Sequence, residues 1–378
     1  MKKIVFLTGT RADYGKLKSL MKKVEESKDF ELHVFVTGMH MLKKYGSTYH
    51  EVEKDGFKNI YKYINQKSSS SHQMDMALSN TIVGLSNYCD EINPDMIVVH
   101  GDRLEALAGA IVGAFNNIKV MHIEGGEVSG TIDESIRHSI TKMSHFHLVA
   151  NEEAKKRIIQ LGEKEESIFV FGSPDIDIMY SSLLPSIEEV KEKYEIKFEN
   201  YSILMYHPVT TEVDKLEANI KQVVDAVINS GKNYVVIYPN NDSGSDVILK
   251  EYERFRKNDK FEIYPSMRFE YFLTLLKECE FIIGNSSSGI REACVYGKIS
   301  IDIGNRQKGR YDENIENIIN TYENIDEITN AIKKVETIKV EPMSHFGSGN
   351  SDEQFLKIIS SDEIWKENIQ KKFIDVDF

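Results

Sequence analysis

Acidic side chains stand at three positions in the first half of the chain where a buried strand should end or a helix should begin. Asp102 and Glu124 each follow a short apolar run, and Asp133 opens a stretch with helical periodicity. Carboxylates gathered at one site can take a proton from one face of a substrate carbon and return a proton to its other face. Neighbouring carboxylates also raise one another's pKa, so that one of them can act as an acid near neutral pH. For Asp102 and Asp133 a second interpretation stays open, because an aspartate at a helix start can serve only as an N-cap.

Two further segments have the composition of anion-binding turns. In the first, Gly9 precedes a helical stretch that carries Arg11 and Lys16. Backbone N–H groups at the start of a helix point towards a bound anion, and cationic side chains add charge. The segment lacks the glycine spacing of a dinucleotide-binding fingerprint or a Walker loop. A plain capped turn between a strand and a helix is the alternative interpretation.

The second segment lies in the second half of the chain and is rich in Ser and Gly. Ser286 and Ser287 would hold a diphosphate with their hydroxyl and N–H groups, and Arg306 would add charge. Glu292, one turn into the following helix, could accept hydrogen bonds from ribose hydroxyls. A flexible serine linker is the alternative, but the apolar run just before the segment favours a turn from strand to helix. His207 ends another apolar run and could donate to a leaving phosphate, although a lone loop histidine is more often structural.

The elements that must position these residues are short apolar strands that alternate with amphipathic helices. In the first half, strands are expected at 3–7, 31–37, 96–100, 119–123, 147–150 and 168–171. In the second half, strands are expected at 202–206, 234–238, 261–264, 281–284 and 299–303, and helices at 212–230, 246–257, 268–278 and 289–296. Such alternation is typical of parallel sheets covered by helices on both faces.

We therefore predict an α/β fold of two Rossmann-like, doubly wound domains with a ligand cleft between them. The first domain is expected at 1–175 and the second at 176–360, with the crossing between them in 174–185. A helix in the last part of the chain, 361–378, is expected to pack back on the first domain.

The composition excludes several classes of function. With 378 residues, 41% of them hydrophobic and 28% charged, the chain can build two cores. The net charge of −13 argues against a nucleic-acid partner, which requires clustered Lys and Arg, but allows a local phosphate site. Cys89, Cys279 and Cys294 show no paired spacing, so neither a disulfide framework nor a zinc site is expected. No apolar run approaches the roughly 20 residues of a membrane span and no signal-peptide pattern is present, so we expect a cytoplasmic protein without a membrane partner.

Together these segments resemble the UDP-N-acetylglucosamine 2-epimerase family, and specifically its hydrolysing branch. The resemblance runs from Lys3 to about Arg310. The motifs that carry it are TGTRADYGKL, VTGMHM, HGDRLEALA, HIEGGEVSGTIDESIRHSI, HPVTTE, YPNND and GNSSSGIREA. The resemblance implies two Rossmann-like domains in the glycosyltransferase-B arrangement, chemistry without a metal or another cofactor, and a homo-oligomer, either a dimer or a tetramer. It also implies a nucleotide-sugar substrate and, as the reaction, the first step of sialic acid synthesis.

The resemblance also implies a role for each matching residue. Asp102, Glu124 and Asp133 would be the catalytic carboxylates, and His207 would assist the departure of the diphosphate. The residues expected to bind the UDP phosphates or their surroundings are Arg11, Lys16, Arg103, Ser286, Ser287 and Arg306. Asn240 and Glu292 would lie near the nucleoside. The implied reaction removes the C2 proton while UDP leaves C1, and water then adds to the resulting 2-acetamidoglucal to give N-acetylmannosamine.

Four alternatives remain beside this expectation. The non-hydrolysing branch typically carries Gln-His where this chain has Gly38-Met39-His40, which favours hydrolysis here. A UDP- or GDP-linked 2,4-diacetamido-2,4,6-trideoxyglucose, the substrate of a legionaminic acid route, would use the same motifs. A glycosyltransferase shares the architecture but needs an acceptor site and only one base, and a non-catalytic binder would not keep several carboxylates beside an anionic ligand.

Overall fold

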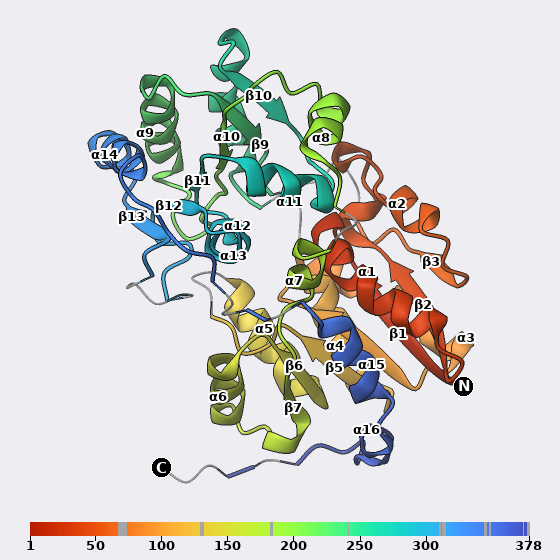
Figure 1. Ribbon diagram of the computed structural model, residues 1–378. Helices are drawn as coiled ribbons and strands as arrows, with labels where there is room; N and C mark the ends of the chain where they lie inside the picture. Colours follow the sequence, from red (N-terminus) through yellow and green to blue (C-terminus); the bar gives the residue numbers. More distant parts are fainter. Residues whose placement is uncertain are drawn as a thin grey trace. The chain divides into compact units, whose positions relative to one another are not determined.

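The computed structural model describes residues 1–66, 74–128, 132–181, 184–240, 242–309, 311, 315–343, 346–347, 349–372 and 374–375. The chain forms two compact α/β units, each built on a parallel sheet (Figure 1). Unit 1 comprises Met1–Glu127, Ile132–Tyr180 and Phe346–Phe378, and unit 2 is mainly Ser181–His345. In the part of the chain that the structure describes, no helix has the length and apolar character needed to cross a membrane.

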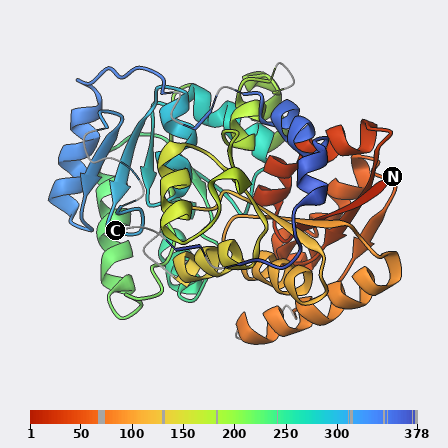
Figure 2. The same cartoon turned by 90° about the horizontal axis from the view of Figure 1, so that it is seen from below.

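The boundaries differ from the expected positions 175 and 361. Unit 1 continues to Tyr180 because helix α7 (Pro174–Met179) buries Ile176 and Met179. The chain returns to unit 1 already at Phe346, because helix α15 (Ser351–Ile359) places Phe355 in the core of that unit. Helix α15 lies beside helix α1 (Arg11–Glu26), although the two are far apart in the sequence (Figures 1 and 2).

Unit 1 contains a seven-stranded sheet in the order β3-β2-β1-β4-β5-β6-β7. Its strands are β1 (Lys2–Thr8), β2 (Phe30–Val36), β3 (Ile60–Lys62), β4 (Met96–His100), β5 (Lys119–Ile123), β6 (Phe146–Val149) and β7 (Ile168–Val170). Its other helices are α2 (Tyr49–Lys54), α3 (Met74–Ile92), α4 (Leu104–Phe115), α5 (Ile132–Met143), α6 (Glu152–Gln160) and α16 (Asp362–Lys366). Alternate residues of β1 pack on opposite faces: Ile4 and Phe6 join the core with α1 and α15, whereas Val5 and Leu7 join the core with α3 and α4.

Unit 2 contains a six-stranded parallel sheet in the order β10-β9-β8-β11-β12-β13. Its strands are β8 (Ser202–Met205), β9 (Tyr234–Ile237), β10 (Phe261–Tyr264), β11 (Phe281–Gly284), β12 (Ile299–Ile303) and β13 (Ile318–Thr321). Its helices are α8 (Ile187–Tyr194), α9 (Leu216–Asn229), α10 (Ser245–Tyr252), α11 (Phe269–Glu278), α12 (Ser287–Ile290), α13 (Glu292–Val295) and α14 (Ile325–Val335). The single helix expected at 289–296 is wrong. Arg291 (φ −97°, ψ −74°) stays in the right-handed region but departs from regular α-helical angles, and it separates α12 from α13.

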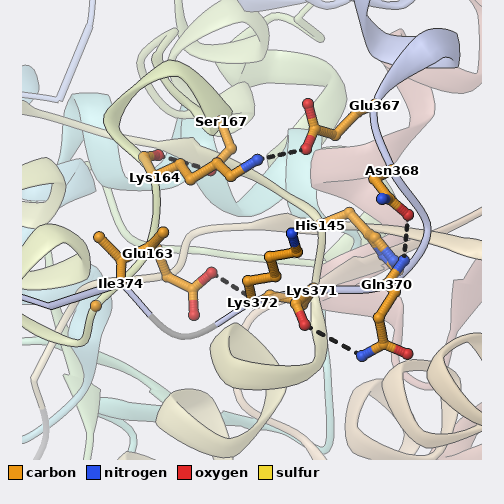
Figure 3. Close-up of a pocket in the computed structure, with 11 residues that line it drawn as sticks. His145, Glu163, Lys164, Ser167, Glu367, Asn368, Gln370, Lys371, Lys372 and Ile374 are labelled. Carbon is orange, nitrogen blue, oxygen red and sulfur yellow. Dashed lines mark hydrogen bonds and ion pairs between the residues drawn. The ribbon is translucent and has the colours of Figure 1, made fainter.

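The C-terminal segment of unit 1 crosses the amino-terminal ends of β5, β6 and β7. Lys119, the first residue of β5, donates to the carbonyl oxygen of Glu367. His145, just before β6, hydrogen-bonds the carbonyl oxygen of Ile369 at 2.8 Å, and Lys164 binds the Glu367 carboxylate at 2.7 Å. A pocket of about 150 Å³ lies here, and Figure 3 shows His145, Lys164 and Glu367 among its lining side chains. The segment therefore covers the amino-terminal ends of these strands, on the side of the sheet away from their carboxyl ends.

A buried carboxylate, Glu163, anchors this segment. It accepts from Lys371 at 2.6 Å (Figure 3). It also accepts from Lys142 at 2.7 Å and lies 3.3 Å from His147 Nε2. Although burial opposes its ionisation, the hydrogen bond from His147 and the nearby lysine charges lower the pKa of Glu163 to about 2. Lys371 also donates to the carbonyl groups that end α5, where a cation is favourable.

We expect Glu163→Gln to lower the free energy of unfolding by about 2 kcal/mol at pH 7, with allowance for solvent screening. The folded pKa lies below the ordinary value of 4.5, so this stabilisation is present above pH 4.5 and is lost as the pH falls towards about 2. Urea unfolding at several pH values measures it. Glu165→Gln, at an exposed carboxylate paired with Lys155, is the control and should change little. Equal stability of Glu163→Gln and the wild type at pH 7 would contradict the prediction.

Candidate active site

Glu124 lies at the carboxyl end of β5 in an unusual backbone conformation. Its φ of +62° is in the left-handed region, and its side chain is only 4% exposed. A non-glycine residue in this region is uncommon and is often found at functional sites. Of the two glycines that follow, Gly126 is required by packing, because a Cβ atom there would stand 2.3 Å from the carbonyl oxygen of Ala154. The turn after β5 is thus packed closely against α6.

Among the described residues, the side chains of Ser173, Lys16 and His100 lie against the Glu124 carboxylate. Ser173 donates its hydroxyl hydrogen to Oε1 at 2.7 Å, and Lys16 Nζ lies 3.6 Å from the same oxygen. His100 Nε2 lies 3.2 Å from Oε2. Lys16 also lies 3.2 Å from Oδ2 of Asp175, a fully buried residue. The structure thus places Lys16 between two carboxylates of unit 1.

Asp102 is connected to the same region through Arg137. The guanidinium of Arg137, which is 2% exposed, donates both to Asp102 Oδ2 and to the backbone carbonyl of Glu124. The N-cap position of α4 is Arg103, so Asp102 lies before it and is not the cap residue. Asp133 lies in the first turn of α5, four residues before Arg137 and hence on the same helix face. Asp102 and the backbone of Glu124 therefore meet at one buried arginine, and Asp133 lies one turn before that arginine on the same helix.

His122 stabilises the turn that carries Asp102. Its Nε2 hydrogen-bonds the carbonyl oxygen of Gly101 at 2.8 Å, and its Nδ1 lies 3.2 Å from Thr141 Oγ1. Burial lowers the pKa of His122 to about 3, so the imidazole is neutral. The His122 side chain therefore stays uncharged at physiological pH and orients the turn after β4.

The turn 8–16 is a capped turn between β1 and α1. Thr10 and Asp13 form a capping box, and the Asp13 carboxylate accepts from the backbone N–H groups of Gly9 and Thr10. Arg11 binds Glu51 at 2.6 Å. The anion-binding interpretation of these two N–H groups is therefore wrong, since the protein's own carboxylate uses them.

In unit 2 the structure fixes the tautomer of His207. Its Nδ1 accepts a hydrogen bond from the backbone N–H of Asn240 at 3.0 Å, so the ring hydrogen must lie on Nε2. Burial, together with the nearby charge of Arg306, holds the pKa of His207 well below its ordinary value. His207 is thus a neutral imidazole that presents one N–H donor.

Asn285, at the end of β11, clamps the backbone of His207. Its Oδ1 accepts from the His207 N–H at 2.7 Å, and its Nδ2 donates to the His207 carbonyl at 2.9 Å. The carbonyl oxygen of Asn285 in turn accepts from Arg306 at 3.2 Å and from Gln307 at 2.7 Å. The ends of β8 and β11 and the segment after β12 therefore form one hydrogen-bonded unit.

The remaining predicted residues of unit 2 surround this centre. Ser286 is the N-cap of α12, where its hydroxyl accepts from the N–H of Ser288, and Ser287 is the first residue of that helix. Glu292 opens α13 and is 3% exposed. The Asn240 side chain donates to Asp242 at 2.5 Å. Asn240 was predicted to lie near a nucleoside, and the structure shows that its backbone also orients His207.

Several residues of these two sites were not predicted from the sequence. They are His100, Arg137, Ser173, Asp175 and Asn285. Three of them lie inside the motifs that drew attention to the site, but their side chains gave no signal of their own. The Ser-Pro-Asp order at 173–175 carries one signal, because proline and an acidic residue are each favoured in the first turn of a helix, and that signal indicates a helix start rather than an ion pair.

Comparison with known proteins gives the family of the chain. The family model described as UDP-N-acetylglucosamine 2-epimerase matches residues 22–360. The chain is 50% identical to UDP-N-acetylglucosamine 2-epimerase of Neisseria meningitidis serogroup B strain MC58 over the full length of both. It is 32% identical to UDP-N,N'-diacetylbacillosamine 2-epimerase (hydrolyzing) of Legionella pneumophila, over 96% of each chain.

A solved structure shares the fold. It is that of the Methanocaldococcus jannaschii UDP-GlcNAc 2-epimerase in complex with UDP-GlcNAc and UDP, with a TM-score of 0.78 and 22% sequence identity. The likeness covers 95% of this chain and 99% of that chain. By the extent of the family match and by the identity to its full-length relatives, the chain belongs to the UDP-N-acetylglucosamine 2-epimerase family.

Proposed function

We propose that the protein converts UDP-N-acetylglucosamine and water into N-acetylmannosamine and UDP. The observation that carries this proposal is the buried Glu124 carboxylate, which accepts a hydrogen bond from Ser173 at Oε1 and has Lys16 and His100 within 3.6 and 3.2 Å of its oxygens. A carboxylate fixed in this way is suited to abstract a proton from a carbon atom. The product would supply the first intermediate of sialic acid synthesis.

The reaction we infer proceeds through an unsaturated sugar. A carboxylate of unit 1 takes the proton from C2, the electrons of the C2–H bond form a C1–C2 double bond, and the C1–O bond breaks with its electrons leaving on UDP. Water then forms a bond from its oxygen to C1 and loses a proton to one carboxylate, while a protonated carboxylic acid of the set gives its proton to C2 from the opposite face. We assign the two proton transfers to the set Asp102, Glu124 and Asp133, because Arg137 connects Asp102 to Glu124 and shares a helix face with Asp133.

Unit 2 would assist the departure of UDP. A neutral His207 with its hydrogen on Nε2 can donate to a phosphate oxygen without first losing or gaining a proton. Arg306 would add positive charge, and α12 begins with the Ser286 and Ser287 pair beside Asn285. Developing negative charge on a leaving diphosphate is stabilised by such fixed donors.

Hydrolysis is supported by two features. The Legionella relative, 32% identical, is named as a hydrolyzing enzyme. Met39 stands where the non-hydrolysing branch typically has glutamine, and a thioether cannot donate a hydrogen bond. The same relative favours a second candidate substrate, a nucleotide-linked 2,4-diacetamido-2,4,6-trideoxyglucose, which would undergo the same reaction.

A product analysis separates these possibilities. The protein is incubated with UDP-GlcNAc and, in parallel, with the UDP- and GDP-linked diacetamido sugars, and nucleotide and free sugar are quantified by chromatography. We expect UDP and free N-acetylmannosamine in equal amounts from UDP-GlcNAc. UDP-N-acetylmannosamine without free UDP would contradict hydrolysis, and turnover of a diacetamido sugar alone would change the substrate.

We expect Arg306→Ala to weaken UDP binding by roughly 10- to 100-fold, the loss typical of one charge-assisted hydrogen bond. The side chain already reaches the end of β11, where it donates to the Asn285 carbonyl at 3.2 Å. Isothermal titration with UDP measures the change. Arg254→Ala is the matched control in the same unit, because Arg254 is paired with Asp225 and Glu251 at the surface and should leave the affinity unchanged. Unchanged affinity of Arg306→Ala would remove this residue from the phosphate site.

A further inference from the structure

Asp175 is a fully buried carboxylate in the first turn of α7. The ammonium group of Lys16, on α1, lies 3.2 Å from its Oδ2 and 3.6 Å from Oε1 of Glu124. The side chain of Lys16 is itself only 13% exposed. One buried cation is thus shared by two buried carboxylates, of which only Glu124 belongs to the set that we assign to proton transfer.

The charges of this arrangement do not cancel. Glu124 and Asp175 carry two negative charges when ionised, and Lys16 supplies one positive charge. The other ionisable groups near Glu124 come from β4, β5, α5 and the turn after β4. The titratable and charged side chains of the described residues in this region include Lys16, His100, Asp102, His122, Asp133, Arg137 and Asp175. Arg137 pairs with Asp102 and His122 is neutral, whereas Lys16 is a cation that contacts both Glu124 and Asp175.

Lys16 alone would make Glu124 a poor base. A cation at this distance stabilises the ionised carboxylate and so reduces its tendency to take a proton. Proton transfer is most efficient when the proton affinity of the base matches the working pH. A second carboxylate beside the cation, Asp175, offsets that effect. Lys16 still lies 3.6 Å from Oε1 of Glu124 and can orient it.

We propose that Asp175 is a positioning residue that offsets the charge of Lys16, so that Lys16 orients Glu124 without depriving it of basicity. Asp175 would not touch the substrate and would act only through Lys16. This inference rests on the proposed role of Glu124 in C2 proton transfer. It deepens that role by naming the group that keeps Glu124 basic beside the charge of Lys16.

Asp177, two residues along the same helix, provides a structural counterpart. Its carboxylate accepts from the backbone N–H groups of Ser351 and Asp352, both at 2.9 Å, and from the Ser351 hydroxyl at 2.6 Å. It therefore caps α15 and holds that helix to α7. Two aspartates of one short helix thus have different partners: Asp177 binds N–H and O–H groups, whereas Asp175 faces a cation that is shared with Glu124.

The test is the pH dependence of deuterium incorporation at C2 of the sugar in D₂O, followed by mass spectrometry with UDP-GlcNAc. The acid limb of this profile reports ionisation of the base. We expect Asp175→Asn to move the midpoint of the acid limb to lower pH by about one unit, and to lower the plateau rate about tenfold because the base is weaker. Lys16→Met should move the midpoint in the opposite direction by about one unit, because two carboxylates are then left without their shared cation.

Two further variants make the test specific to the charge of Asp175. The double variant K16M/D175N should return the midpoint to within a few tenths of a unit of the wild type, and Asp175→Glu should largely restore the wild-type profile. Asp177→Asn is the control, and it should lower the melting temperature while leaving the profile in place. A merely structural Asp175 would lower rate or stability at all pH values without opposite shifts in the two single variants.

The outcomes distinguish this proposal from the proposed function. If the wild type exchanges the C2 hydrogen and the profile of D175N superposes on it, the role of Asp175 is overturned while C2 chemistry stands. If exchange occurs without UDP release, the proposed hydrolysis is overturned. The role of Asp175 is then still tested by the shifts of the pH midpoint in the variants. If the wild type exchanges neither UDP-GlcNAc nor the diacetamido sugars, both proposals are overturned.

Discussion

Glu124→Gln is expected to lower the rate of C2 proton exchange by about 10²- to 10⁴-fold, the range of a general acid–base step. Glutamine keeps the shape of the side chain and can still accept the hydrogen bond from Ser173, but it cannot take a proton. The rate is measured by deuterium incorporation at C2 under saturating substrate. Because the residues assigned to UDP binding after β8, β11 and β12 lie in unit 2, the affinity for UDP should change little.

The control for this variant is Glu134→Gln. Glu134 lies next to Asp133 in α5, its side chain is 39% exposed and pairs with His138, and its loss should leave the rate unchanged. Asp133→Asn is the companion variant, with a loss of the same order. Rates near that of the wild type in both Glu124→Gln and Asp133→Asn would contradict proton transfer by the carboxylates around Arg137.

The second large effect is expected for His207→Ala, with a loss of about 10²- to 10³-fold in the rate of UDP release, as for other single donors to developing negative charge. The Asn285 clamp binds only the backbone of residue 207, so the turn should keep its shape when the side chain is removed. Chromatography of the released nucleotide measures the rate. His50→Ala, at an exposed histidine of unit 1, is the control.

The protonation of His207 gives this prediction a second readout. Because burial and the charge of Arg306 hold the pKa of His207 well below its ordinary value, the residue stays neutral and contributes no step to the pH profile between pH 6 and 9. UDP release by His207→Ala at a rate close to the wild type would show that the imidazole does not assist the leaving group.

Much of the fold could be predicted because buried parallel strands are continuous apolar runs. The segment 96–100 is one such run, and it forms β4 with the expected bounds. The edge strands β3 and β13 were not predicted. In β3 all three residues are at least partly exposed, so no buried run marks it. In β13 polar residues interrupt the apolar pattern.

The location of the carboxylates could also be predicted, but their partners could not. Asp102 and Glu124 end neighbouring strands, and the carboxyl ends of parallel strands meet at one edge of a sheet. The neighbour of Lys16 depends on how α7 packs against α1, which no local pattern encodes. Because Lys16 follows a glycine-containing turn, the sequence predicted a phosphate contact for it. In the structure, packing places Lys16 between Glu124 and Asp175.

A similar limit applies to the second site. The Ser/Gly-rich turn was predicted to bind phosphate from its composition, and the structure shows that Ser286 caps a helix of only four residues. The residue that organises the turn is Asn285, whose amide must be oriented by the backbone of a separate strand. The sequence shows an asparagine there, but its hydrogen-bond partners become apparent only when β8 and β11 lie side by side.

The most direct measurement of the central claim is proton NMR of the reaction with UDP-GlcNAc in D₂O. Our account predicts free N-acetylmannosamine that carries deuterium at C2 from its first appearance, with one UDP released per sugar. N-acetylmannosamine or N-acetylglucosamine that retains hydrogen at C2 would contradict inversion by proton abstraction and return.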